Sequence, residues 1–538
     1  MEDPDFIVVG AGSAGCAVAE RLSANGRYKV LVLEAGGTDR RFFIQMPLGY
    51  GKTYMDPAVN WMYASEPDPG LAGQQDYWPR GKVLGGSSSI NAMVWIRGAP
   101  QDYDDWEAAG NPGWGWKEML PVFKLIEDND GGESDLRGVG GPMHVSTIDC
   151  RVHPLTHSFI KAAGEAGLAF NPDFNGPQQE GAGIWQQNMK GGRRNSAARA
   201  FLRPAMKRAN VRVLTNAQAT RIMMEGERAT GIEYRRNGRV EQVSARREVI
   251  ICGGSVNSPQ LLQLSGIGPA DHLRSLGIEV KVGNWQVGSN LEDHQGVNYT
   301  FRANCRTLND VLRPWWGKML VGMQYLMFGK GPLSLSINHG GGFFRTDPKL
   351  GRPNMQLYFQ AFSTVLPGVG ERPVLSPDPF SGFSIGLSNC RPRSRGEIMI
   401  RSADPFEKPR ITANAFSVDS DVADMLAGVK FVRRIAASPS LESMIAEEIL
   451  PGPSCRSDEE LISDFRRRSG TVFHPVSTCR MAPDARSGVV DARLRVHGVR
   501  NLRVIDASVF PGVITGNTNA AAIAVGWRGA SFILEDAK

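Results

Sequence analysis

The sequence predicts an α/β protein built around a parallel sheet, and three observations support this fold class. The chain has 538 residues, which is enough for two or more domains or for one large two-lobed body. Its 62 glycines gather in clusters, which indicates sharp turns and close backbone approaches. Near the N-terminus, one glycine cluster lies between two short apolar runs, in the order strand, helix, strand.

Composition and charge limit the classes of protein to which the chain can belong. Hydrophobic residues make up 41% and charged residues 22%, as in an ordinary folded protein, so disorder is excluded for most of the chain. A net charge of +6 over this length, without a long Lys/Arg run, does not favour a nucleic-acid partner. No run of about 18 apolar residues occurs, so no membrane span is expected.

Cysteine usage and the first residues indicate a cytoplasmic protein. The seven cysteines are scattered and never spaced as CxxC, so reduced thiols are expected rather than a disulfide framework or a zinc site. Residues 1–5 lack the basic segment and the apolar run of a secretory signal. None of the eight histidines lies in an HExxH arrangement, and no metal site is expected.

The first glycine cluster has the form of a dinucleotide-binding turn. Three glycines in the pattern GxGxxG follow an apolar strand and precede a helix-like stretch: Gly10, Gly12 and Gly15. Gly10 permits the tight turn, Gly12 lets the backbone meet a diphosphate, and Gly15 allows close packing of helix on strand. The diphosphate is expected at the helix N-terminus, where free N–H groups and the helix dipole favour an anion.

The second strand of this unit ends at an acidic residue, Glu34. A carboxylate there can accept hydrogen bonds from both hydroxyls of an adenosine ribose, and it repels a 2′-phosphate, so NADP is disfavoured. This motif alone does not separate NAD from FAD. The candidate cofactor-binding residues of the unit are Gly10, Gly12, Ser13, Gly15, Glu34 and Ala35.

Two further glycine-rich segments help to distinguish an FAD-binding protein from an NAD-binding protein. Residues 80–93 read RGKVLGGSSSINAM, and residues 252–268 read CGGSVNSPQLLQLSGIG. Small residues in series expose main-chain N–H groups and leave room for a flat ring. Together with the C-terminal stretch, these segments resemble the glucose–methanol–choline (GMC) oxidoreductases, which are FAD enzymes. The resemblance runs from residue 5 to residue 535 in the order of the family, and it implies FAD as the cofactor.

By this resemblance, a further set of residues contacts the cofactor: Val83, Gly86, Asn91, Ala92, Met93, Val94, Ala219, Asp506, Ala507 and Thr518. Ala219 matches the segment whose backbone meets adenine, and Asp506 and Ala507 match positions that touch the flavin and the ribityl chain. Some members bind FAD covalently through a histidine at the position where this chain has Ile90. Because an alkyl side chain cannot form that bond, FAD is expected to be bound non-covalently.

The resemblance also implies two domains that are discontinuous in sequence. A Rossmann-like α/β FAD-binding domain of GMC type would comprise residues 1–155, 195–300 and 466–538. An α+β substrate-binding domain, with helices behind an antiparallel sheet, would comprise residues 156–194 and 301–465. Three segments of the sequence support the second domain: 355–359 and 382–387 as strands, and 422–436 as an amphipathic helix.

Two residues near the C-terminus match the catalytic pair of the family. His474 begins the stretch HPVSTCRM, which resembles the catalytic HPxGTxRM motif with Ser477 at the position where glycine is usual. Pro475 favours an extended conformation at His474. Asn517 matches the second member of the pair, and it is also expected to cap the helix predicted by the alanines that follow. A helix beginning there would direct its positive end at the flavin.

The reaction implied by the resemblance is oxidation of a primary or secondary alcohol to an aldehyde or ketone. Neutral His474 would take the hydroxyl proton as general base, with Asn517 as its partner, while hydride passes from carbon to flavin N5. Many members carry a glutamate where this chain has His339. A choline-like cation would lose a carboxylate partner there, so choline is disfavoured and His339 is a candidate substrate contact.

Three other functions remain as alternatives to alcohol oxidation. The first alternative is a lyase, because a few members of the family cleave cyanohydrins. The second is a flavin-binding protein that has no catalytic activity. An NAD-dependent dehydrogenase is the alternative if only the first motif is considered. The expected partners are a small-molecule alcohol and either oxygen or a quinone-type electron acceptor, and no feature of the sequence indicates an oligomeric state.

Overall fold

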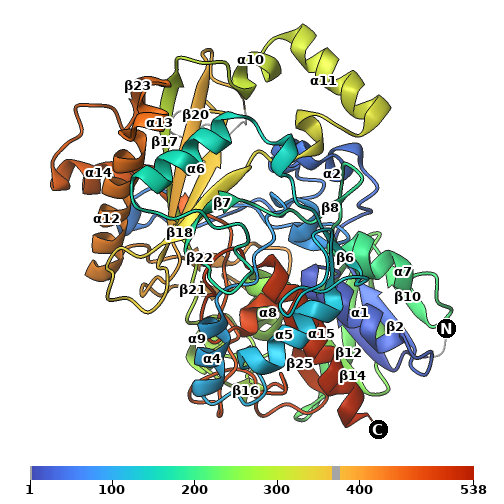
Figure 1. Cartoon of the computed structure of the whole chain (residues 1–538). Helices are drawn as coiled ribbons and strands as arrows, with labels where there is room; N and C mark the ends of the chain where they lie inside the picture. Colours follow the sequence, from blue (N-terminus) through green and yellow to red (C-terminus); the bar gives the residue numbers. More distant parts are fainter. Residues whose placement is uncertain (1–2, 366–375, 538) are drawn as a thin grey trace.

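The computed structural model describes residues 3–365 and 376–537, and it contains the predicted parallel sheet (Figure 1). Five strands form this sheet in the order β10-β2-β1-β14-β25. Their bounds are β1 (Phe6–Val9), β2 (Val30–Leu33), β10 (Val211–Leu214), β14 (Glu248–Ile251) and β25 (Leu502–Val504). All four pairings are parallel. The central strands are nearly continuous runs of Val, Ile and Leu because both faces of the sheet are covered.

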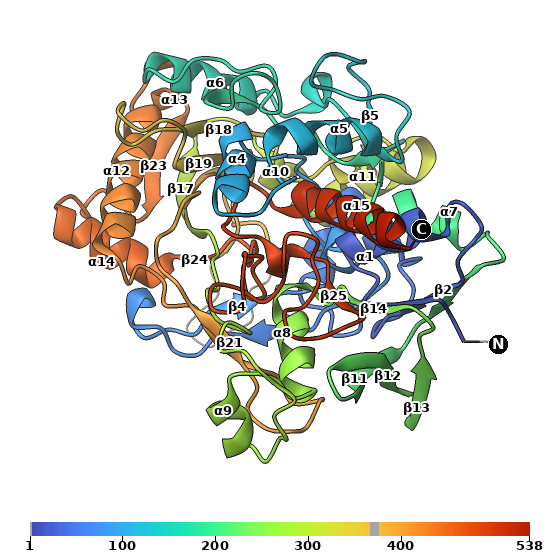
Figure 2. The same cartoon turned by 90° about the horizontal axis from the view of Figure 1, so that it is seen from below.

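Two helices bring their N-termini together beside this sheet (Figure 2). Helix α1 (Ser13–Ser23) packs on β1 and β2, and α15 (Asn519–Asp536) packs along α1. The two helices approach closely at Gly526, where a Cβ atom would lie 2.6 Å from the Ala14 carbonyl oxygen. The Ser13 hydroxyl donates a hydrogen bond to Asn519 Oδ1 at 2.8 Å. Both positive helix ends therefore lie next to each other.

A second, seven-stranded sheet is antiparallel throughout. Its order is β23-β17-β20-β19-β18-β7, with β24 paired to β17. The strands are β7 (Gly181–Ile184), β17 (Gln295–Ala303), β18 (Gly340–Phe344), β19 (Met355–Gln360), β20 (Gly382–Asn389), β23 (Ile445–Leu450) and β24 (Gly470–Thr471). The predicted fold class, a parallel α/β part with an α+β part, is confirmed. Strand β17 crosses the expected domain boundary at residue 300.

The two faces of the antiparallel sheet have different neighbours because successive side chains alternate across a strand. Tyr299 of β17 faces Ile385 of β20, and Leu357 of β19 faces Leu387. These residues belong to a hydrophobic core shared with α6 (Leu155–Glu165) and α12 (Asp419–Ala436). The intervening residues of the same strands border a cavity, so the sheet separates a packed core from the candidate site.

The remaining helices and strands connect and cover the two sheets (Figure 1). The helices are α2 (Phe42–Gln45), α3 (Tyr50–Thr53), α4 (Pro100–Ala108), α5 (Trp116–Ile126), α7 (Arg203–Ala205), α8 (Gly254–Leu264), α9 (Ala270–Ser275), α10 (Leu308–Leu312), α11 (Trp315–Phe328), α13 (Pro439–Glu442) and α14 (Asp458–Arg468). The strands are β3 (Tyr63–Ala64), β4 (Tyr77–Trp78), β5 (Glu127–Asn129), β6 (Met143–Val145), β8 (Met189–Lys190), β9 (Arg193–Arg194), β11 (Ala217–Glu225), β12 (Arg228–Arg236), β13 (Arg239–Ser244), β15 (Ile267–Gly268), β16 (Val282–Gly283), β21 (Glu397–Met399) and β22 (Arg410–Thr412). Across the described residues, no helix has both the length and the apolarity needed to span a bilayer.

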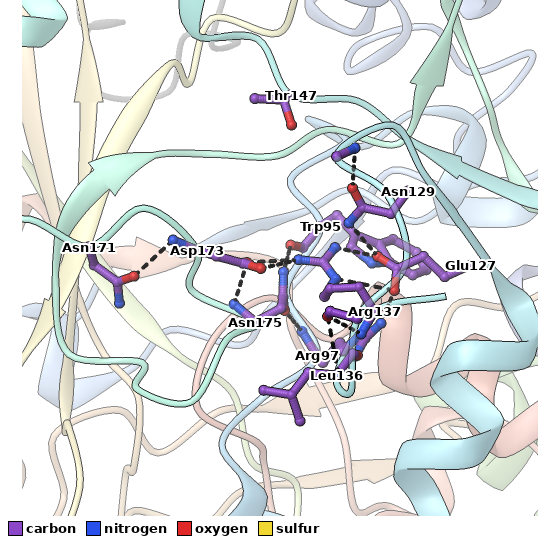
Figure 3. A network of polar contacts seen from close by, with 12 residues as sticks. Trp95, Arg97, Glu127, Asn129, Leu136, Arg137, Thr147, Asn171, Asp173 and Asn175 are labelled. Carbon is purple, nitrogen blue, oxygen red and sulfur yellow. Dashed lines mark hydrogen bonds and ion pairs between the residues drawn. The ribbon is translucent and has the colours of Figure 1, made fainter. Parts of the chain in front are cut away.

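A buried network of charged residues connects β5 to the loops that carry Arg97, Arg137 and Asp173 (Figure 3). The side chains of Arg97 and Glu127 are fully buried and form an ion pair, and Glu127 also pairs with Arg137. Arg137 continues the network to Asp173, with Nη1 at 2.7 and 2.6 Å from the two carboxylate oxygens. The Arg97 backbone donates to Asn175 at 2.8 Å. The network therefore joins segments of both expected domains.

Removing the central carboxylate of this network should destabilise the fold. In Glu127→Gln, the buried Arg97 guanidinium loses its charged partner and Arg137 keeps only Asp173, and we expect a loss of about 3–5 kcal/mol in the free energy of unfolding. Denaturant unfolding followed by fluorescence measures it. As a matched control, Asp271→Asn breaks the exposed pair with Arg274 and should change stability by less than about 1 kcal/mol. Equal effects of the two changes would contradict this account of the network.

Candidate active site

A cavity of about 620 Å³ is lined by residues of both sheets. At one end it is bordered by Val9, Leu33 and Ile251, the last residues of β1, β2 and β14. At the other end it is bordered by residues of β17, β19 and β20, among them Asn298 and Tyr358. The carboxyl ends of the strands of a parallel sheet are where such folds bind their ligands.

Glycines allow the backbone segments around this cavity to meet. Gly10 has a φ of +102°, and a Cβ atom there would lie 2.4 Å from the Cys252 carbonyl oxygen, so no other residue fits. A Cβ atom at Gly86 would lie 2.7 Å from the Gly12 Cα atom. The predicted glycine-rich segments 10–15 and 80–93 are therefore in direct backbone contact.

Three features of the lining fit an FAD molecule. The cavity receives the N-termini of α1 and α15, which suit a diphosphate and an electron-rich ring. A Cβ atom added to Gly254, which lines the cavity, would meet nothing within 4 Å, so open space lies there. Asn519 Nδ2 is a buried donor that has no partner among the described residues.

Glu34 lies at the adenine-ribose end that the first motif predicts. It is buried, and its oxygens accept hydrogen bonds from the backbone N–H groups of Ala11 at 2.9 Å and Gly36 at 2.8 Å. Burial raises the pKa of Glu34 to about 7, while the two N–H donors and Lys82 act in the opposite direction. Two ribose hydroxyls donating to this carboxylate would add further stabilisation of its charged form.

At the other end of the cavity, His474 is part of a linear series of hydrogen bonds. Its Nε2 atom lies 3.0 Å from Asn517 Nδ2, and its Nδ1 atom lies 3.0 Å from His294 Nδ1. Asn517 Oδ1 accepts from Gln356 Nε2 at 3.1 Å, and Gln356 Oε1 accepts from the Tyr358 hydroxyl at 2.7 Å. On the far side, His294 Nε2 lies 3.1 Å from the Cys390 carbonyl oxygen.

This series determines where the protons of both imidazoles lie. Burial lowers the pKa of His294 to about 4, so the ring is neutral at pH 7. A carbonyl oxygen only accepts hydrogen bonds, so His294 Nε2 carries the proton and its Nδ1 is an acceptor. His474 Nδ1 must then donate to His294. Burial, with His294 and Arg80 nearby, holds the pKa of His474 well below its usual value, so its Nε2 is unprotonated and accepts from Asn517 Nδ2.

The backbone around His474 is held by the buried carboxylate of Asp293 and by the partly buried guanidinium of Arg80. Asp293 accepts from the His474 N–H group at 2.8 Å and from the Thr471 hydroxyl. Arg80 Nη2 donates to the Phe473 carbonyl oxygen at 3.0 Å. Phe473 has a φ of +71°, a left-handed conformation that these contacts stabilise. The orientation of the imidazole is thus set from both sides of the residue.

Most of the residues expected at the site border this one cavity. Those that do are Gly10, Gly12, Ser13, Glu34, Ala35, Gly86, Asn91, Ala92, Met93, Val94, Ala219, His474, Asp506, Ala507, Asn517 and Thr518. Gly15 and Val83 are buried behind it, and a Cβ atom on Gly15 would lie 2.0 Å from the Gly10 carbonyl oxygen. His339 does not border the cavity. It is buried, and its Nδ1 atom lies 3.4 Å from the backbone nitrogen of His153.

The expected N-cap role of Asn517 is wrong. Helix α15 begins at Asn519, and Thr518 occupies the N-cap position without a side-chain hydrogen bond to the helix. The amide of Asn517 instead binds His474 and Gln356.

Sequence reasoning also missed His294, Gln356 and Asp293, because each acts through contacts with residues far away in the chain. No cluster of metal-ligating side chains occurs within residues 3–365 and 376–537.

Comparison with known proteins agrees with the fold. Residues 4–296 and 392–526 match the family described as GMC oxidoreductase. The chain is 41% identical to an alcohol dehydrogenase [acceptor] of Pseudomonas putida, over 98% of this chain and 95% of that protein. It is 40% identical to an oxygen-dependent choline dehydrogenase of Rhizobium meliloti strain 1021, with the same coverage. A structure concerning FAD modification in formate oxidase from Aspergillus oryzae RIB40 superimposes with a TM-score of 0.91 at 28% identity, covering 100% of this chain and 99% of that one.

The fold and the site therefore define an oxidoreductase that acts on CH–OH groups, and the chain belongs to the GMC oxidoreductase family. Its cofactor is FAD, which the lining of the cavity fits. The resemblance inferred from the sequence motifs is confirmed.

Proposed function

We propose that this protein oxidises an uncharged primary or secondary alcohol to an aldehyde or ketone, with His474 as general base. The observation that carries the proposal is the unprotonated His474 Nε2 atom at the cavity wall, whose acceptor role is fixed by the series of hydrogen bonds from the Tyr358 hydroxyl to the Cys390 carbonyl oxygen. A neutral imidazole with a fixed acceptor atom is suited to take a hydroxyl proton.

Each residue of the series has a distinct part in this proposal. An alcohol hydroxyl would donate to His474 Nε2, and Asn517 Nδ2, now 3.0 Å from that nitrogen, would donate to the alcohol oxygen. Gln356 holds the Asn517 amide in this orientation because it donates to Oδ1. When bound, FAD supplies the hydride acceptor. His294 accepts from His474 Nδ1 and would stabilise the positive charge that the ring gains with the proton.

The charge of the lining supports an uncharged substrate. Among the described residues that border the cavity, the carboxylates are Glu34 and Asp506, and both follow strands of the parallel sheet. Asp506 is engaged by Ser258 at 2.6 Å and by the Gly254 N–H group at 2.8 Å. A quaternary ammonium group placed near His474 would have no carboxylate partner there, which makes desolvation of that cation costly.

The test is flavin reduction by alcohols in the absence of oxygen. Bleaching of the flavin by at least one uncharged alcohol, faster than by choline at equal concentration, is the expected result. In His474→Ala, FAD should stay bound and the bleaching rate should fall by roughly 10²–10⁴-fold, because the proposed general base is removed. Stopped-flow absorbance measures both rates.

The matched control is His157→Ala, which removes an exposed histidine on α6 and should leave the bleaching rate unchanged. Faster bleaching by choline than by every uncharged alcohol would overturn the substrate class. A His474→Ala rate within about a factor of three of wild type would overturn the role of His474 as base.

We also propose that FAD is held without a covalent bond. The residue beside Asn91 that borders the cavity is Ile90, whose side chain has no nucleophilic atom. Acid precipitation should therefore release all of the FAD into the supernatant, where its absorbance is compared with that of the holoenzyme. Flavin fluorescence that stays with the polypeptide on a denaturing gel would show that a covalent bond exists.

A further inference from the structure

Helix α11 lies at the periphery of the protein (Figure 1). Many of its large apolar side chains are exposed. Its sequence is WWGKMLVGMQYLMF, and only Gly317, Val321 and Tyr325 are buried. Eight large apolar side chains are exposed, with 75% of Trp315 and 70% of Leu326 accessible: Trp315, Trp316, Met319, Leu320, Met323, Leu326, Met327 and Phe328. A surface helix of a soluble protein normally places polar residues on this side.

The exposed apolar residues form one continuous stripe. The buried residues Gly317, Val321 and Tyr325 recur every fourth position and mark the side that packs on the protein. At 100° per residue, all of the exposed apolar side chains except the terminal Phe328 fall within an arc of about 140° on the opposite side. The side of the helix that faces solvent is therefore apolar.

A second element enlarges this surface. In α2, Phe42 is 52% exposed and Phe43 is 45% exposed. The Phe42 ring lies edge-on to the Tyr325 ring of α11, with centroids 6.2 Å apart, so the two elements are neighbours. We call the exposed apolar residues of α11, together with Phe42 and Phe43, the α11 face.

The charges around the α11 face are positive. Arg313, Lys318 and Lys330 are exposed in and beside α11, and no Asp or Glu occurs between residues 311 and 346. Arg40 is exposed next to Phe42.

The acidic residues that flank α11 and α2 in sequence are already engaged. Asp310 accepts hydrogen bonds from Ser381 at 2.9 and 2.8 Å. Asp56 pairs with Arg41 at 3.0 Å, and Asp39 pairs with Arg203 at 2.9 Å. The surroundings of the α11 face thus match an anionic surface.

We propose that the α11 face docks on the surface of an anionic phospholipid bilayer, with α11 lying in the plane of the interface. A helix of 14 residues is too short to cross the hydrocarbon core, but its apolar stripe can enter the headgroup region while flanking Lys and Arg side chains meet phosphates. The paired Trp315 and Trp316 are residues of the type that prefers this interface.

A second copy of the chain fits the α11 face less well. In a two-fold dimer the same patch meets itself, so Arg313, Lys318 and Lys330 would meet a second α11 face, which contains no acidic residue. The anionic bilayer has complementary charge over the whole face. Docking would also bring the cavity close to the lipid, because Tyr50 and Ile337 border the cavity and also belong to the apolar cluster beneath α11.

Sedimentation of the FAD-loaded protein with lipid vesicles tests the proposal. We expect wild-type protein to sediment with vesicles of phosphatidylcholine and phosphatidylglycerol at 7:3, and at least fivefold less with phosphatidylcholine alone. Trp315→Ser/Leu326→Ser should weaken binding to the anionic vesicles at least tenfold, and Lys318→Glu/Lys330→Glu at least fivefold.

Matched controls separate the α11 face from general surface effects. Trp285→Ser/Val240→Ser removes equally exposed apolar residues elsewhere, with 60% and 62% of the side chains accessible, and Lys161→Glu/Lys349→Glu reverses two distant exposed charges. Both should bind vesicles within twofold of wild type. FAD content and the unfolding midpoint report that each variant is folded.

Three results would overturn the proposal. The first is wild-type protein that stays in the supernatant with every vesicle composition. The second is a Trp315→Ser/Leu326→Ser variant that binds as well as its control. The third is a wild-type dimer that this variant converts to a monomer in sedimentation velocity, because a second copy would then cover the α11 face.

Discussion

The proposed chemistry of this site depends on the hydrogen bond between the Nδ1 atoms of His294 and His474. When two neutral imidazoles face each other, one must donate the hydrogen bond and the other must accept it. The Cys390 carbonyl oxygen can only accept, so His294 carries its proton on Nε2 and accepts from His474 at Nδ1. The lone pair of His474 Nε2 is thereby directed to the cavity. Burial supports this arrangement, since it keeps both rings neutral.

The two halves of the fold contribute different properties to the site. The parallel sheet and the N-termini of α1 and α15 supply backbone donors that suit the phosphates and ring of FAD. The antiparallel sheet supplies the face that holds Gln356 and Tyr358 against Asn517, with a rigid core behind it. The Arg97–Glu127 pair and its neighbours fix these halves to each other, so the series of hydrogen bonds that spans them keeps its geometry.

The sequence predicted those parts of the site that depend on local patterns. The strand, glycine turn, helix and terminal Glu34 lie within about 30 residues, and the structure places each of them as expected. His294 could not be predicted, because its partner is 180 positions away and no motif marks it. Asn517 was misread as a cap because capping preference ignores the tertiary contacts that hold it outside α15. Ser477, where the motif that the sequence resembles has glycine, adopts a φ of +72°, a conformation that glycine adopts without strain.

The position of one hydrogen atom tests this account most directly. A neutron diffraction structure of the FAD-loaded enzyme, exchanged into D₂O at pH 8, would locate the deuterium atoms on both imidazoles. The account predicts deuterium on Nδ1 of His474 and on Nε2 of His294, with none on Nε2 of His474. Deuterium on Nε2 of His474 would make that atom a donor toward the cavity and would contradict its assignment as the base.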